Sequence, residues 1–310
     1  MSTVMPEPEQ WASLVPARDT ITWQRASDAR MCVAAGYALL LQVSHPIVGA
    51  GVSEHSQFAH DPWGRLFRTL DYTYTMVYGG PQAAGEMGRR IRTFHRQITG
   101  VLPDGRRYSA LEPDAYAWVH ATLAAAIVGA HERFGRPFAP HEREEFWIQW
   151  RALGRLLGVR QRDLPAGWEQ FQTYFRDTAA ATLVRTAAVD EVLAALGSPS
   201  PPDMPRLAAA GWVPVQISLG HVIELTSVGL LGEQLRERLG LRWSGRQERR
   251  IRLLATMMRA GTPLMPSWLL STGPTYLRQR AGAIARGDVA APERLSRRSS
   301  AALPVRRPQW

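Results

Sequence analysis

The chain has 310 residues, 45% of them hydrophobic and 21% charged, with a formal net charge of +10. This length allows two domains or one larger helical domain with a substantial core. The single cysteine, Cys32, excludes an internal disulfide framework, a zinc ribbon and a covalent Cys-x-x-Cys-His haem attachment. The N-terminus lacks the basic, apolar and small-residue regions of a signal peptide, so we expect a cytoplasmic protein.

Every basic residue is an arginine, and the basic excess lies after Arg242, where Glu248, Asp288 and Glu293 are the only acids. Such a distribution suits nucleic acid or an anionic membrane surface. No aromatic-and-basic nucleic-acid motif accompanies the arginines. We therefore expect no nucleic-acid partner and interpret the use of arginine as a codon bias.

Helical periodicity dominates, and hardly any alternating run of polar and β-branched residues is long enough for a sheet, so the predicted fold class is all-α. A polar segment of residues 1–27 precedes a helical domain of residues 28–286. Residues 287–310 form a basic tail that we expect to be mobile. Within the domain the sequence predicts helices over residues 28–43, 62–78, 81–99, 113–134, 141–157, 167–183, 189–196, 204–210, 215–239, 246–259 and 274–286.

The most apolar window, residues 31–52, is long enough to suggest a membrane span, but Gln42, His45 and Pro46 interrupt it. We therefore predict a buried core helix and no integral membrane span. Residues 44–56 are predicted as a loop. This loop concentrates histidines, hydroxyl groups and a carboxylate, which makes it a candidate wall of a site.

Arg65, Arg68 and Thr69 share one face of the helix predicted over residues 62–78. Two arginines three residues apart usually form a solvated face. The rest of this helix is largely apolar, however, so we expect part of the arginine face to be buried. A buried guanidinium needs an anion, a carboxylate or a ligand, and Asp71 or Glu54 can supply the carboxylate.

His95 lies near the end of the next predicted helix. A noncovalent haem needs one imidazole on a stiff element, so His95 is the first candidate for an iron ligand, although a helical histidine is more often structural. We interpret His120 as a core histidine bonded to a backbone carbonyl, with a cofactor role as the alternative. His131 and His141 are predicted to be surface residues.

Other metal and catalytic motifs are missing from the sequence. There is no His-Glu-x-x-His, Glu-x-x-His, Gly-x-Ser-x-Gly or Walker motif, which disfavours zincins, di-iron bundles, ordinary hydrolases and phosphotransferases. Cys32 lies among apolar residues and is predicted to be a small core residue rather than a haem thiolate. His221 is expected either to pair with Glu224 or to reach the site.

Six short stretches resemble the MpaB-type oxygenase family, which includes latex-clearing rubber oxygenases and the fungal oxygenase of mycophenolic acid biosynthesis. They appear in family order across roughly residues 28–175. The stretches are LQVSHP at 41–46, GVSEHS at 51–56, DPWGRLFRT at 61–69, HRQITG at 95–100, YAWVH at 116–120, and GV leading to LP at 158–165.

The resemblance implies a single helical domain with a globin-like core around a b-type haem. His95 would be the proximal iron ligand, and the face of Arg65, Arg68 and Thr69 would lie on the distal side. Rubber oxygenases carry a lysine at the position of Arg68. Because arginine does not deprotonate, it ligates iron poorly, so we do not expect a six-coordinate resting state or rubber cleavage.

The resemblance further implies an oxygenase that acts on an apolar, isoprenoid-like small molecule, with O2 bound opposite His95 and an electron donor as a further partner. Glu54 or His55 would deliver protons. His45 and His120 are further candidate contacts of the cofactor. Two alternatives stay open: a non-catalytic haem protein for sensing or electron transfer, and a cofactor-free helical interaction protein.

Overall fold

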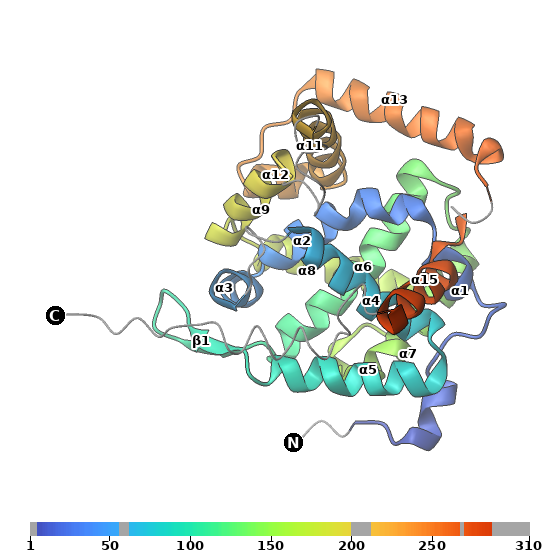
Figure 1. The fold of residues 1–310 in the computed structure, drawn as a ribbon. Helices are drawn as coiled ribbons and strands as arrows, with labels where there is room; N and C mark the ends of the chain where they lie inside the picture. Colours follow the sequence, from blue (N-terminus) through green and yellow to red (C-terminus); the bar gives the residue numbers. More distant parts are fainter. Residues whose placement is uncertain (1–4, 56–61, 200–211, 267–269, 287–310) are drawn as a thin grey trace.

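The computed structural model describes residues 5–55, 62–199, 212–266 and 270–286 (Figure 1). Helices make up most of this part of the chain, which confirms the all-α fold class. The chain also forms one short hairpin that the sequence did not predict, in which β1 (Thr99–Val101) pairs antiparallel with β2 (Arg107–Ser109).

The described helices follow one another along the chain with short connections, and η denotes a 3₁₀ helix. In order they are η1 (Pro8–Ser13), α1 (Ile21–Arg25), η2 (Ala29–Ala34), α2 (Ala35–Val43), α3 (Pro46–His55), α4 (Pro62–Tyr78), α5 (Gly80–His95), α6 (Pro113–Phe134), α7 (Pro140–Leu156), η3 (Gln161–Asp163), α8 (Trp168–Ala181), α9 (Ala187–Gly197), α11 (Trp212–Gly229), α12 (Glu233–Arg238), α13 (Gly245–Gly261), η4 (Thr262–Leu264) and α15 (Thr272–Arg286).

Local signals set several helix ends. Pro113 and Pro140 occupy the first turns of α6 and α7, where a proline has the right φ and its missing N–H breaks no helical bond. Glu142 strengthens the start of α7, since its carboxylate accepts a hydrogen bond from the Ala139 N–H at 2.8 Å. Beyond α7, Gly158 has a φ of +79°, which a residue with a side chain rarely adopts.

The structure corrects three of the predicted elements. Residues 46–55 form the helix α3, whereas a loop was predicted. The helix predicted over residues 28–43 begins as the 3₁₀ helix η2, and the one predicted over residues 215–239 is divided into α11 and α12. The helix predicted over residues 204–210 and the tail of residues 287–310 lie outside the described residues.

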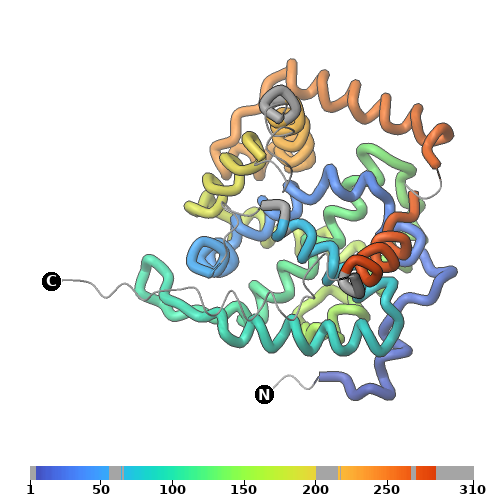
Figure 2. The backbone as a smooth tube through the Cα atoms, viewed as in Figure 1, coloured from blue at the N-terminus to red at the C-terminus, as the bar shows by residue number. Residues whose placement is uncertain are grey.

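The N-terminal segment packs against the body of the protein. Trp11 is 3% exposed, and its indole N–H donates to the Pro6 carbonyl at 3.1 Å. The backbone N–H of Thr22 donates to the Gln149 side chain at 3.0 Å, which ties α1 to α7. Figure 2 shows this segment running beside the start of α5.

The core is built around α6, which crosses the middle of the molecule (Figure 1). Ala117, Trp118, Ala121 and Ala124 are fully buried there. The small side chains of the three alanines allow η2 and α2 to pack closely on one side of α6 and α7 on another.

In the described part of the chain, no single helix is both long and apolar enough to cross a membrane. Residues 29–43 and 46–55 satisfy that condition only together, and the two helical segments are bent by 106° relative to each other. Leu40, Leu41 and Val43, in the first of these segments, are fully buried inside the protein.

Candidate functional site

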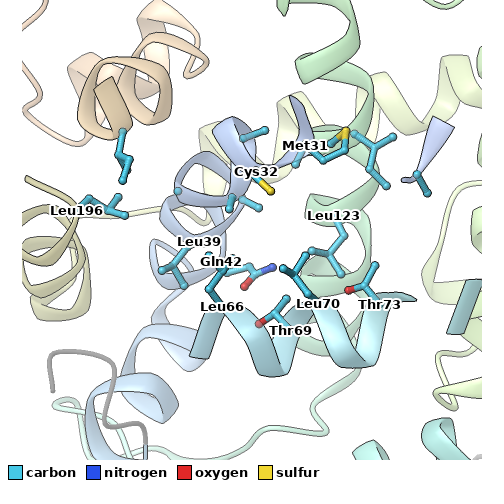
Figure 3. Close-up of a pocket in the computed structure, with 18 of the residues that line it drawn as sticks. Met31, Cys32, Leu39, Gln42, Leu66, Thr69, Leu70, Thr73, Leu123 and Leu196 are labelled. Carbon is cyan, nitrogen blue, oxygen red and sulfur yellow. The ribbon is translucent and has the colours of Figure 1, made fainter. Parts of the chain in front are cut away.

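A mainly apolar pocket with a volume of about 220 Å³ lies between α2, α4 and α6. Figure 3 shows Leu39, Leu66, Leu70 and Leu123 around it. Ligand pockets in proteins occupy roughly 300–1,000 Å³ and are lined by apolar side chains with a few polar groups. The pocket therefore has walls that suit an apolar small molecule, while its volume lies somewhat below that range.

The polar groups of the pocket gather between α2 and α4. The side chains of Gln42, Thr69 and Thr73 face the same space (Figure 3). Gln42 donates from Nε2 to the Thr122 hydroxyl at 3.1 Å, and that hydroxyl donates to the Val119 carbonyl at 2.7 Å. This chain of bonds fixes the amide and leaves its Oε1 as a hydrogen-bond acceptor for a ligand.

Cys32 also lines the pocket and is exposed there, which corrects the prediction of a core residue. The side chain is reached through the pocket while protein surrounds it on the other sides. Burial, and next the charge of Asp28, raise the pKa of the thiol. Cys32 is therefore a neutral, weakly polar part of the pocket wall.

His95 is half-buried at the end of α5, and its Nδ1 lies 2.7 Å from the Ile91 carbonyl oxygen. Since a carbonyl can only accept, Nδ1 must donate, which places the lone pair of the neutral imidazole on Nε2. The edge of the ring also meets Tyr116, with the ring centres 5.5 Å apart. A histidine that ligates a metal through Nε2 is held by this kind of bond at its other nitrogen, so the donor chemistry of His95 fits a haem ligand.

The described residues contain no group of three His, Cys, Asp or Glu side chains that could hold a metal ion. A haem does not need such a group, because its macrocycle supplies four nitrogens and the protein adds an axial ligand. No residue of α5 is among the described residues that line the pocket. The structure therefore does not place His95 in the pocket wall.

The predicted arginine face lies on α4. Arg68 is half-buried, Thr69 lines the pocket, and the side chain of Arg65 lies outside the described residues. Burial raises the pKa of the Tyr72 phenol, whereas the charges of Arg68 and then Arg90 oppose that rise. Arg68 of α4 and Arg90 of α5 thus act on the same tyrosine.

Among the described residues, both predicted carboxylates have partners outside the arginine face. Asp71 is bound instead by α15, through the Arg280 guanidinium at 2.8–3.0 Å and the Tyr276 hydroxyl at 2.7 Å. Glu54 accepts a hydrogen bond from the Tyr108 hydroxyl at 2.8 Å. Both interactions join residues far apart in the chain, so no local sequence pattern could predict them.

Glu54 and His55 lie together at the end of α3. The His55 Nε2 is 3.7 Å from a Glu54 carboxylate oxygen and 3.1 Å from the Thr99 carbonyl oxygen. Both side chains are exposed. Thr99 begins β1, four residues after His95, so the pair sits beside the segment that follows the candidate iron ligand.

His45 and His120 are both buried, and neither lines the pocket. The Nδ1 of His45 has no hydrogen-bond partner among the described residues, and the Nε2 of His120 lies 2.8 Å from the Trp150 carbonyl oxygen. Burial lowers the pKa of each imidazole to about 4, so both are neutral at pH 7. His120 thus has the backbone contact predicted for a core histidine.

The remaining histidines of the described residues divide between the core and the surface. His131 is buried and its Nε2 lies 2.9 Å from the Arg25 carbonyl oxygen, so the prediction of a surface position was wrong. His141 is exposed, as predicted. His221 is exposed on α11.

The family model described as "ER-bound oxygenase mpaB/B'/Rubber oxygenase, catalytic domain" matches residues 23–260. The chain belongs to this family. The match confirms the resemblance found in the sequence and supports an oxygenase, and therefore an oxidoreductase.

Two mycobacterial relatives are similar to the chain, and neither is functionally named. They are the uncharacterized protein Rv2237 of Mycobacterium tuberculosis and the uncharacterized protein Mb2261 of Mycobacterium bovis. Each is 24% identical over 238 residues, which cover 74% of this chain and 89% of the relative. No solved structure matches the chain significantly.

Proposed function

We propose that the protein is a haem b-dependent oxygenase acting on an apolar small molecule bound between α2, α4 and α6. One observation carries the haem assignment: His95 donates from Nδ1 to the Ile91 carbonyl at 2.7 Å, in a chain of an oxygenase family. This tautomer presents the Nε2 lone pair that an iron ligand requires.

The haem, when bound, supplies the activation of O2. His95 would hold it through Nε2. Arg68, and by its position on the same helix Arg65, would provide permanent positive charge for a propionate carboxylate or for negative charge that develops during the reaction.

The pocket supports an apolar substrate with one polar group. Its leucine walls would exclude water and bury a hydrocarbon skeleton such as an isoprenoid. Gln42 and Thr69 would bind a hydroxyl or carbonyl of that substrate and so fix which carbon is presented for oxidation. Thr69 lines the pocket and also belongs to the predicted arginine face, so the pocket and that face meet on α4.

Glu54 and His55 would move protons between solvent and the site, because they are exposed and lie 3.7 Å apart. The buried, unpartnered Nδ1 of His45 can bond a water molecule or a cofactor group. His120, held by Trp150, would then have a positioning role. O2 is the expected co-substrate, and a separate protein or small molecule would supply electrons.

The test is the absorption spectrum of the purified protein, oxidised, reduced with dithionite and then exposed to CO, with iron quantified. We expect a Soret band that shifts at each step. His95→Gly should lose the bound haem or alter its spectrum, and added imidazole should restore the band by replacing the missing ligand. His141→Gly, at an exposed histidine, serves as the matched control.

Three outcomes would contradict the proposal. A protein that stays colourless after expression with excess haem has no haem site. An unchanged spectrum in His95→Gly would remove His95 as the ligand. A normal haem spectrum without consumption of O2 across apolar substrates and reductants would point to a non-catalytic haem protein instead.

A further inference from the structure

Helix α13 lies along one edge of the molecule (Figure 1) and contacts α6 and α11 through one face only. Ile251 is fully buried in this contact and Ala255 is 2% exposed. The opposite face of α13 has no described element packed against it.

Large apolar side chains are exposed on that outer face. Leu253 is 62% exposed and Met257 is 63% exposed. Leu264, in the η4 turn that follows directly, is 87% exposed. Few other large apolar side chains in the described residues are as exposed, so the three make one end of this edge unusually apolar.

Three arginines continue the same face toward the start of the helix. Arg246, Arg249 and Arg250 precede Leu253 by seven, four and three residues, so all of them point to the side of Leu253 and Met257. All three are exposed. In the described part of the chain, none of their guanidinium groups forms an ion pair or a side-chain hydrogen bond.

No acid offsets these charges on the outer face. Glu248 is the only carboxylate between residues 242 and 264, and it is turned toward the protein. It accepts hydrogen bonds from Arg133 at 2.9 Å, from Arg252 at 2.8 Å and from the Trp243 indole at 3.1 Å. The outer face is therefore positive at one end and apolar at the other.

Helix stability does not explain the arginines. Arg246 lies in the first turn of α13, where the helix dipole disfavours positive charge, and Arg249 and Arg250 follow in the second turn. A partner with negative charge and an apolar interior would use both ends of the face, and a bilayer surface with anionic headgroups has this chemistry.

We propose that the face formed by Arg246, Arg249, Arg250, Leu253, Met257 and Leu264 docks on an anionic lipid surface. The helix would lie in the plane of the headgroups, with the arginines beside phosphates and the apolar side chains below them. Such docking is peripheral and needs no spanning helix. It does not depend on haem or turnover, so the proposed function and this inference fail independently.

The test is flotation of the purified protein with vesicles of phosphatidylcholine alone and with vesicles containing about one third phosphatidylglycerol. We expect the protein to float only with the anionic vesicles and to be released by salt. The combined variant Arg246→Gln, Arg249→Gln and Arg250→Gln should weaken partitioning about a hundredfold, at about fivefold for each charge.

The apolar contribution is tested separately. Leu253→Ser combined with Met257→Ser should weaken partitioning at least about tenfold, since each side chain would lose its burial among acyl chains. Two controls match these changes elsewhere on the surface. They are Ile148→Ser, and the combined variant Arg107→Gln, Arg155→Gln and Arg176→Gln.

Three results would overturn the proposal. The first is the absence of binding to anionic vesicles. The second is binding that the control variants reduce as much as the α13 variants do. The third is a protein that binds no vesicles but forms a concentration-dependent dimer, and whose dimer is lost when Leu253→Ser and Met257→Ser are combined. That result would assign the face to a second copy of the chain.

Discussion

Replacing Arg280 of α15 by methionine leaves the Asp71 carboxylate of α4 buried without its counter-charge. The Arg280 guanidinium binds Asp71 in two places, with its Nε 3.0 Å from Oδ1 and its Nη2 2.8 Å from Oδ2. The two side chains are 16% and 6% exposed. Water therefore screens this pair far less than a surface ion pair.

The expected loss follows from that burial. Removing one partner of a buried ion pair costs about 3–5 kcal/mol. Tyr276 would still donate to Asp71 at 2.7 Å, so we expect the lower end, a decrease of about 3 kcal/mol in the free energy of unfolding. With a urea m-value of about 3 kcal/mol/M, the midpoint of unfolding would fall by about 1 M.

Urea unfolding followed by circular dichroism measures this change. Arg278→Met is the matched control, because Arg278 lies on the same helix and is exposed. Combining Asp71→Asn with Arg280→Met should recover part of the loss, since no unpaired charge remains buried. A decrease below about 0.5 kcal/mol for Arg280→Met would refute the reasoning and mark the pair as a surface interaction.

Two further predictions concern packing and pH. Gly88→Ala should lower the free energy of unfolding by about 1–3 kcal/mol, because the new Cβ would lie 2.1 Å from the Leu156 carbonyl oxygen. The control is Gly261→Ala, whose Cβ would meet nothing within 4 Å and which should be neutral or stabilising. Thermal melts of the two variants measure the difference. Burial lowers the pKa of His120 to about 4 from 6.5, so folding favours its neutral form. Its contribution to stability is therefore complete above pH 6.5 and is lost as the pH falls toward 4, by about 2 kcal/mol at pH 5. Urea midpoints measured across this pH range should depend less on pH in His120→Gln than in the unchanged protein.

The sequence predicts elements well where the signals are local. The bounds of α4 and α6 agree with the prediction, because a proline starts each helix and a glycine follows its end. The loop predicted over residues 44–56 was wrong, because residues 46–55 form the helix α3. In the structure Gly49 is inside α3, where a Cβ would lie 2.6 Å from the Val43 carbonyl oxygen and 2.8 Å from the Thr186 hydroxyl.

Contacts between distant segments are the features that the sequence does not predict. Trp11 lies against Gly85, whose Cβ would be within 2.3 Å of the indole ring, and this contact brings the polar N-terminus into the fold. His131 is buried because it meets a carbonyl 106 residues away. Gln42 offered a usable signal, since an amide in the most apolar helix needs a hydrogen-bond partner or a ligand.

Helix α4 connects the two parts of the proposed site. Thr69 faces the pocket, while Arg68 is about 100° further around the helix and acts on Tyr72 together with Arg90 of α5. A small movement of α4 would therefore change both the polar wall of the pocket and the charge near the helix that carries His95. Because the Asp71–Arg280 pair joins α4 to α15, it would also hold Thr69 and Arg68 in place for the proposed site.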